Sequence, residues 1–227
     1  MTGGQRGCDF LALWEAGAAE HPLDRALGLI AGIEGTLRAE AAALPLDRRD
    51  RALYRIGERL FGEQIRLMAT CKDCGAETEL GFSTRDVLAV PAVAERISLP
   101  DRNAVCRLPN SCDLAAALAS SEPQRALVAA VIDAPEPDEA TVAAVEAALA
   151  AEAGIADLTL AHSCAACGAA GETPFDILDY LWRRITAEAQ RLLRDIHTIA
   201  GAYGWSGEAI LALSPKRRAA HVALIGG

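Results

Sequence analysis

The feature that most constrains the fold is a Cys-x-x-Cys-Gly motif that occurs twice. The first copy is Cys71 to Gly75 and the second is Cys164 to Gly168, and Cys164 follows Cys74 by 90 positions. A thiol pair at i and i+3 places both sulfurs on one side of a tight turn, and the next glycine accepts the positive φ that folds the backbone beneath a bound ion. Stretches with strand character flank both motifs, at 64–70, 77–82, 157–162 and 171–175. The sequence therefore predicts two hairpins with a cysteine pair in each turn.

The four cysteines Cys71, Cys74, Cys164 and Cys167 are the expected ligands of one structural Zn²⁺. Four thiolates complete a tetrahedral shell and leave no open position for catalysis. The gap between the pairs is far longer than the roughly 15 to 20 residues of a compact site, so we expect a zinc ribbon split by a domain-sized insertion. Two other interpretations stay open: a thioredoxin-like redox pair, although neither pair precedes a helix of a βαβ unit, and a degenerate ribbon without metal.

The remaining cysteines, and a histidine near the second pair, are expected to be structural. Cys8, Cys106 and Cys112 lack metal-ligand spacing, and we predict that they are small buried hydrophobic residues. His162 lies two residues before Cys164 and is a possible competing ligand. Because four cysteines already complete the shell, we predict that it is a strand residue.

The hydrophobic pattern predicts an α+β fold that is mostly helical. Its expected parts are an N-terminal helical segment (1–62), the split ribbon (63–82 and 155–175), an insertion with a β-hairpin and helices (83–154), and a long helix with two short ones (176–227). The hairpin of the insertion is expected to turn at 100–103. From 176 to 203 apolar residues recur every three or four positions, which predicts one amphipathic helix of roughly 40 Å.

Serine and aspartate residues are the expected N-caps of several helices. Asp47 is the predicted cap of a helix over 48–61, and Ser111 of one that ends near residue 120. Ser206 and Ser214 are the predicted caps of the two final helices, with Pro215 at the first helical position of the last.

Composition narrows the classes of function. The net charge is −9, which disfavours a general phosphate-binding surface. No apolar run approaches the roughly 20 residues that span a bilayer, and the first 17 residues do not resemble a signal peptide. We therefore expect a cytoplasmic protein. The basic run Lys216-Arg217-Arg218 is either a solvated helix face or a partner contact.

Several short motifs resemble, in their order, the T-even phage base-plate protein family of contractile tails and related bacterial particles. They are 13–17 (LWEAG), 21–27 (HPLDRAL), 48–50 (RRD), 60–62 (LFG), both cysteine motifs, 107–111 (RLPNS) with 113–114 (DL), 203–206 (YGWS), Glu208, 210–215 (ILALSP) and 217–218 (RR). The resemblance implies a non-enzymatic structural or assembly role, with other base-plate or hub proteins as partners and no small-molecule substrate. It leaves open whether the protein stays in the finished particle or acts as an assembly chaperone.

Within this resemblance, Tyr203, Trp205 and the basic run of Lys216, Arg217 and Arg218 are the residues that we expect to contact partners. The resemblance implies a protein made in the bacterial cytoplasm and then available for incorporation into a tail-like particle. Two alternatives belong to other classes. One is a zinc-ribbon protein that binds nucleic acid or regulates expression, which the negative charge disfavours. The other is a thiol oxidoreductase, which requires a reactive thiolate.

Overall fold

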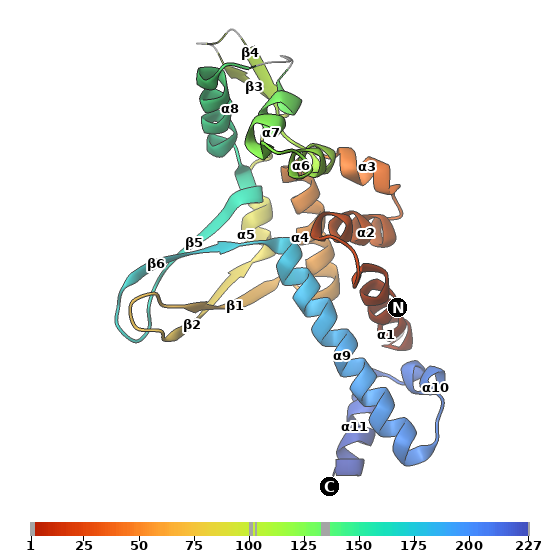
Figure 1. Ribbon diagram of the computed structural model, residues 1–227. Coiled ribbons are helices and arrows are strands. Elements are labelled where there is room, and N and C mark those ends of the chain that lie inside the picture. The colour runs from red at the N-terminus through yellow and green to blue at the C-terminus, as the bar shows by residue number, and fades with distance from the viewer. Residues whose placement is uncertain (1–2, 100–101, 103, 133–136, 227) are drawn as a thin grey trace. The chain divides into compact units, whose positions relative to one another are not determined.

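The computed structural model describes residues 3–99, 102, 104–132 and 137–226, with side chains from residue 10 onward (Figure 1). The fold is α+β and 61% helical, with small antiparallel hairpins and a long helix near the C-terminus, which confirms the predicted class. The chain divides into a terminal unit, residues 1–28 and 179–227, and a central unit, residues 29–178. The division falls inside the expected 1–62 segment, because the first 28 residues belong with the C-terminal helices.

The terminal unit is built along helix α9 (Ile177–Tyr203), whose bounds match the amphipathic helix expected from the sequence. The other helices of the unit are α1 (Gly3–Gly17), the start of α2 (Pro22–Glu34), α10 (Gly207–Ala212) and α11 (Pro215–Gly226). The apolar stripe of α9 is buried at Leu181, Ile185, Ala189, Leu192 and Ile199. Burial of this stripe is the main hydrophobic contribution of the helix.

A close contact between helices explains a glycine of the terminal unit. A Cβ at Gly17 would lie 2.7 Å from the ring of Trp182, so a larger residue would push the ring away. The guanidinium of Arg25 lies over the same ring, 4.6 Å from its centroid, and its Nε donates to the Gly17 carbonyl over 2.9 Å. Trp182 therefore joins α1, α2 and α9.

The predicted caps of the last two helices are confirmed. The Ser206 hydroxyl accepts a hydrogen bond from the Ala209 N–H at the start of α10. The Ser214 hydroxyl accepts one from the Arg217 N–H, 3.3 Å away, at the start of α11. Each serine satisfies a backbone donor that the first helical turn leaves without a partner.

Helix α4 (Leu46–Phe61) is the centre of the central unit, and its Leu53, Tyr54 and Ile56 are almost completely buried. The short helix α3 (Arg38–Ala43), which the sequence pattern did not predict, precedes it. The predicted N-cap at Asp47 is wrong. Pro45 occupies the cap position, and Asp47 lies within the first turn, where its carboxylate binds Arg51 and caps no N–H group of α4.

The two cysteine-bearing hairpins lie beside one another in the central unit (Figure 1). The first pairs β1 (Gln64–Thr70) with β2 (Glu77–Ser83), with Leu67 opposite Leu80. The second pairs β5 (Leu158–Ser163) with β6 (Ala170–Phe175), with Leu160 opposite Thr173. A short helix, α5 (Thr84–Ala89), follows β2. Both hairpins match the sequence prediction.

The insertion between the hairpins has its own small core. It comprises β3 (Arg96–Leu99), β4 (Ala104–Arg107), α6 (Ser111–Leu118), α7 (Pro123–Val131), α8 (Glu139–Ala151) and a 3₁₀ turn, η2 (Gly154–Asp157). The buried residues of this core are Leu99, Cys106, Val128, Val131, Ile132 and Val145. The β3–β4 pairing confirms the predicted hairpin, while positions 100, 101 and 103 of its expected turn lie outside the described residues.

The predicted cap of α6 is also wrong. Asn110 is the N-cap: its side chain accepts from the Asp113 N–H, and the Asp113 carboxylate accepts from the Asn110 N–H. Ser111 is the first helical residue and is buried. The reciprocal pair satisfies two backbone donors, more than a cap at Ser111 could.

Candidate metal centre

The two cysteine motifs fold into turns of the same geometry. In the first, the Cys71 N–H donates to the Ala76 carbonyl over 2.9 Å, and the Gly75 N–H donates to the Cys71 carbonyl over 3.0 Å. The equivalent bonds of the second turn measure 2.8 and 2.9 Å. Gly75 and Gly168 have φ of 72° and 75°, a region that favours glycine. This geometry explains why each motif ends in glycine.

The turns bring all four predicted ligands together. The sulfurs of Cys71 and Cys167 are 3.8 Å apart, and those of Cys74 and Cys164 are 3.6 Å apart. All four sulfurs lie within 4.8 Å of one another. Both of the short contacts join a cysteine of one hairpin to a cysteine of the other, so neither hairpin makes the cluster alone.

The spacing of the sulfurs fits a tetrahedral metal ion. Ligands at about 2.3 Å from a tetrahedral centre lie about 3.8 Å apart, close to the two short distances. The same distances are far longer than the roughly 2.05 Å of a disulfide bond. Cys71 and Cys164 are buried while Cys74 and Cys167 are exposed, so one thiol of each pair faces the protein and the other faces solvent. The four cysteines thus form a site that could hold a metal ion.

The thiols of Cys164 and Cys167 differ in pKa because they make different hydrogen bonds. The N–H groups of Cys167 and Ala166 donate to the Cys164 sulfur and, with the neighbouring thiols, lower the pKa of Cys164 to about 6. The hydrogen bond from the Ala169 N–H alone would lower the pKa of Cys167. The contacts of the Cys167 thiol with the sulfurs of Cys74 and Cys164 outweigh it and raise that pKa to about 12. Without metal the cluster therefore keeps part of its protons, which a metal ion must displace on binding.

Aromatic packing and one hydrogen bond join the two hairpins to each other and to α4. Phe175, at the end of β6, meets Phe82 of β2 edge to face with ring centroids 5.0 Å apart. It also lies 6.3 Å from the ring of Tyr54 on α4. Nearer the cysteines, the Ala165 N–H donates to the Thr78 hydroxyl over 3.2 Å. These contacts hold the two hairpins together near the cysteine turns and at the opposite end.

A buried ion pair on α4 fixes the two places where the insertion leaves and returns. Arg51 Nε donates to the Asp47 carboxylate over 2.8 Å, and the two side chains are 9% and 2% exposed. The other nitrogens of Arg51 donate to the carbonyls of Leu88, in the last turn of α5, and of Val90 and Pro91, just after it. Asp47 also accepts from the Ile155 N–H, just before β5.

Gly154 is required at this anchor. It has φ of 59°, and a Cβ there would lie 2.7 Å from Asp47 Oδ1. The chain therefore returns from the insertion at a defined point on α4, at Gly154, which is four positions before β5 begins at Leu158. Because both ends of the insertion are fixed on one helix, the 90-position gap costs little additional chain entropy at the cysteines.

The residues expected to contact partners lie away from the sulfur cluster in sequence, in the terminal unit. Tyr203, Trp205, Lys216 and Arg217 are exposed. Arg218 is not: its side chain is 1% exposed, and its Nε lies 3.8 Å from an Asp195 carboxylate oxygen. The expectation that Arg218 presents a charge to a partner is wrong, because helical periodicity turns the third basic residue of the run into the interior.

The other cysteines and His162 follow the predictions in part. Cys106 is completely buried, as predicted, while Cys112 is exposed, which corrects that prediction. Helix α6 turns Cys112 outward beside the buried Ser111. The side chain of Cys8 lies outside the described part of the chain. His162 is a β5 residue that hydrogen bonds the Thr173 hydroxyl over 3.0 Å, as expected of a strand residue.

Sequence reasoning missed Asp47 and Arg51 as the residues that anchor the second hairpin. Their spacing of four positions on a helix predicts an ion pair, but an ordinary surface ion pair has the same spacing. Their partners lie 37 to 108 positions away, so no local pattern identifies them.

Comparisons with protein-family models, with curated proteins and with solved structures find no significant match to this chain. Among the described residues, no helix combines the length and apolar character needed to traverse a bilayer.

Proposed function

We propose that Cys71, Cys74, Cys164 and Cys167 hold one structural Zn²⁺. The supporting observation is the four-sulfur cluster, which offers only soft ligands at tetrahedral spacing. Such a shell suits Zn²⁺ or a single iron ion, and paired Cys-x-x-Cys turns are typical of zinc sites. The metal would cross-link segments that are 90 positions apart, and the chemistry that it supplies is coordination alone.

Elemental analysis of freshly purified protein tests the metal. The proposal expects one zinc per chain and no colour. Iron, recognised by its thiolate charge-transfer absorption, would contradict the assignment of zinc, and protein without any bound metal would contradict the metal site itself.

We propose further that the protein is a non-enzymatic structural or assembly component of a contractile phage-type tail base plate. The observation that carries this proposal is the ordered series of motifs from LWEAG at 13–17 to ILALSP at 210–215. Two features are consistent with it. A closed four-sulfur shell serves stability and not turnover, and exposed aromatic residues at Tyr203 and Trp205 suit a protein contact.

Deletion of the coding sequence tests this role. The proposal expects loss of assembled contractile tails in electron micrographs, restored by the wild-type chain supplied in trans. Base-plate or hub proteins should also co-purify with the tagged wild-type chain. Normal tails in the deletion strain would overturn the proposal. Salt-sensitive binding of DNA or RNA would point instead to a zinc-ribbon protein of the nucleic-acid class.

A further inference from the structure

Three aromatic rings gather at the C-terminal end of α9. The ring centroids of Tyr203 and Trp205 are 5.2 Å apart with an interplanar angle of 30°. The ring of His221, from α11, meets both at steep angles, with centroids 5.6 and 5.1 Å away. Tyr203 is 42% exposed and Trp205 is 40% exposed, although aromatic residues make up only 4% of the chain. A protein with few aromatic side chains thus presents two of them to solvent side by side.

Basic and apolar residues of α11 extend this aromatic group. Lys216 and Arg217 are exposed in the first turn, which contains no acidic residue. Arg217, His221 and Leu224 are spaced by four and three and therefore share one helix face, and Leu224 is 75% exposed. Lys216 precedes Arg217 and lies about 100° around the helix from it. We call the set Tyr203, Trp205, Lys216, Arg217, His221 and Leu224 the C-terminal surface.

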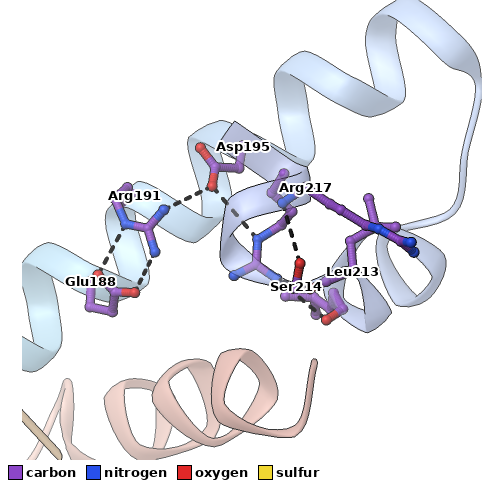
Figure 2. A network of polar contacts seen from close by, with 8 residues as sticks. Glu188, Arg191, Asp195, Leu213, Ser214 and Arg217 are labelled. Carbon is purple, nitrogen blue, oxygen red and sulfur yellow. Dashed lines mark hydrogen bonds and ion pairs between the residues drawn. The ribbon is translucent and has the colours of Figure 1, made fainter. Parts of the chain in front are cut away.

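An internal ion network holds α11 in the position that forms the C-terminal surface (Figure 2). Arg191 donates to Glu188 and, over 3.1 Å, to Asp195, all on α9. Asp195 is also paired with Arg218 of α11. Arg218 Nη1 donates to the Leu213 carbonyl over 2.7 Å, which fixes the turn between α10 and α11. His221, one helical turn after Arg218, is thereby kept against the two exposed rings.

The ion network does not neutralise the positive charge of the C-terminal surface. Glu188, Arg191, Asp195 and Arg218 carry two charges of each sign, so their sum is zero. Lys216 and Arg217 take part in none of the ion pairs found among the described residues. The one acidic residue from 203 onward is Glu208, on α10.

Charge is also divided unevenly between the units. Residues 29–178 carry 13 basic and 23 acidic residues, a net charge of −10, whereas the terminal unit carries +1. The basic pair in the first turn of α11 is therefore a local feature of an acidic chain. A partner that meets it gains charge complementarity if the partner itself is acidic.

We propose that the C-terminal surface docks an acidic segment of a partner protein that inserts an aromatic or aliphatic side chain beside Trp205. Tyr, Trp and Arg are the residues that most often dominate binding energy at protein interfaces. Lys216 and Arg217 then select an acidic rim, and Leu224 extends the apolar contact. This inference rests on the proposed function in one respect, namely that the partner is an assembly protein.

The arrangement of the rings favours a protein over a single-stranded nucleic acid. Nucleic-acid platforms offer open aromatic faces on which bases stack, together with a basic groove that follows the backbone. Here Tyr203 and Trp205 lie against each other and the edge contacts of His221 occupy them further. Two exposed cations are too few for a groove that follows a phosphate backbone.

Fluorescence anisotropy with labelled synthetic peptides tests the proposal on the full chain. The peptides carry several Asp and Glu residues around one Trp, Phe or Leu, and matched peptides replace the acids by Asn and Gln. We expect saturable binding of the acidic peptides, at least about tenfold weaker binding of the neutral ones, and a decrease with salt. Trp205→Ala should weaken binding about 30-fold, as for a central interface residue. The double variant Lys216→Ala/Arg217→Ala should weaken it about fivefold.

Leu118→Ala and Arg85→Ala are the matched controls, because both side chains are well exposed and lie in the central unit. They should bind as the wild type does. Equal binding of acidic and neutral peptides, or unchanged binding by Trp205→Ala, would overturn the proposal. Tighter binding of a labelled DNA or RNA oligonucleotide, or salt-sensitive dimerisation of the chain that Trp205→Ala abolishes, would do so as well. Because the assay contains no tail protein, its failure is distinct from a failure of the deletion experiment.

Discussion

Replacement of Asp47 by alanine tests how the structure brings two distant hairpins together. The change leaves the Arg51 guanidinium in a site where its side chain is 9% exposed, without its carboxylate partner. It also leaves the Ile155 N–H without the acceptor that fixes the entrance to β5. The first loss acts at Leu88 to Pro91, where the insertion begins, and the second acts on the segment that leads to Cys164 and Cys167.

The magnitude follows from the burial of the pair. Removing one member of a buried ion pair costs about 3–5 kcal/mol. Arg51 keeps its bonds to the carbonyls of Leu88, Val90 and Pro91, so we expect the lower end, about 3 kcal/mol. That loss corresponds to roughly a 150-fold smaller folding constant, and to a fall of about 10 °C in the melting temperature of a unit of this size.

Two assays measure the consequences of Asp47→Ala. Thermal and urea unfolding followed by circular dichroism report the stability. Competition with a chromophoric chelator reports the zinc affinity, which should fall by about tenfold or more, as for residues that orient ligands from outside the coordination shell. Asp157→Ala is the control, because Asp157 is exposed in the same turn as Ile155 and its loss should change stability by less than about 0.5 kcal/mol. A variant that melts and binds zinc like the control would refute the anchoring role.

The metal site, the ion network of the terminal unit and the Arg107–Asp113 pair each contribute stability that can be measured. Replacing Cys71 or Cys167 by serine should abolish stoichiometric zinc and lower the melting temperature, and chelation of the wild type should have the same effect, since the metal is part of the folding free energy. Arg218→Met should destabilise the terminal unit by about 2–4 kcal/mol in urea unfolding, because it removes a buried charge from its network; an unchanged midpoint would argue against that network. Burial alone would raise the pKa of Asp113, but its hydrogen bonds with Arg107 lower it. The carboxylate therefore contributes stability that is present above pH about 4 and is lost as pH falls through the lower folded pKa, so the stability gap between wild type and Asp113→Asn should narrow in acid.

Local patterns predicted the long helix and the two hairpins that carry the metal site. Helix α9 follows from apolar residues at every third or fourth position, and both hairpins follow from strand-like stretches around a repeated motif. The candidate ligands followed from spacing, because a thiol pair at i and i+3 before glycine has few other uses. In each case the information lies within a few residues.

Features decided by distant partners were not predictable. Asp47 looks like a cap from its neighbours, and its position is set instead by Arg51 and by a backbone donor 108 positions later. Arg218 looks like part of a solvated run, yet the packing of α11 on α9 turns it toward Asp195. Short helices such as α3 and α5 depend on their surroundings more than on their own propensity.

Absorption fine structure at the zinc edge of the freshly purified protein tests whether the two hairpins hold one metal ion together. We expect one zinc per chain with four sulfur neighbours at about 2.3 Å, which requires Cys71 and Cys74 of one hairpin together with Cys164 and Cys167 of the other. A shell with fewer sulfurs, or protein that folds without zinc, would contradict this expectation.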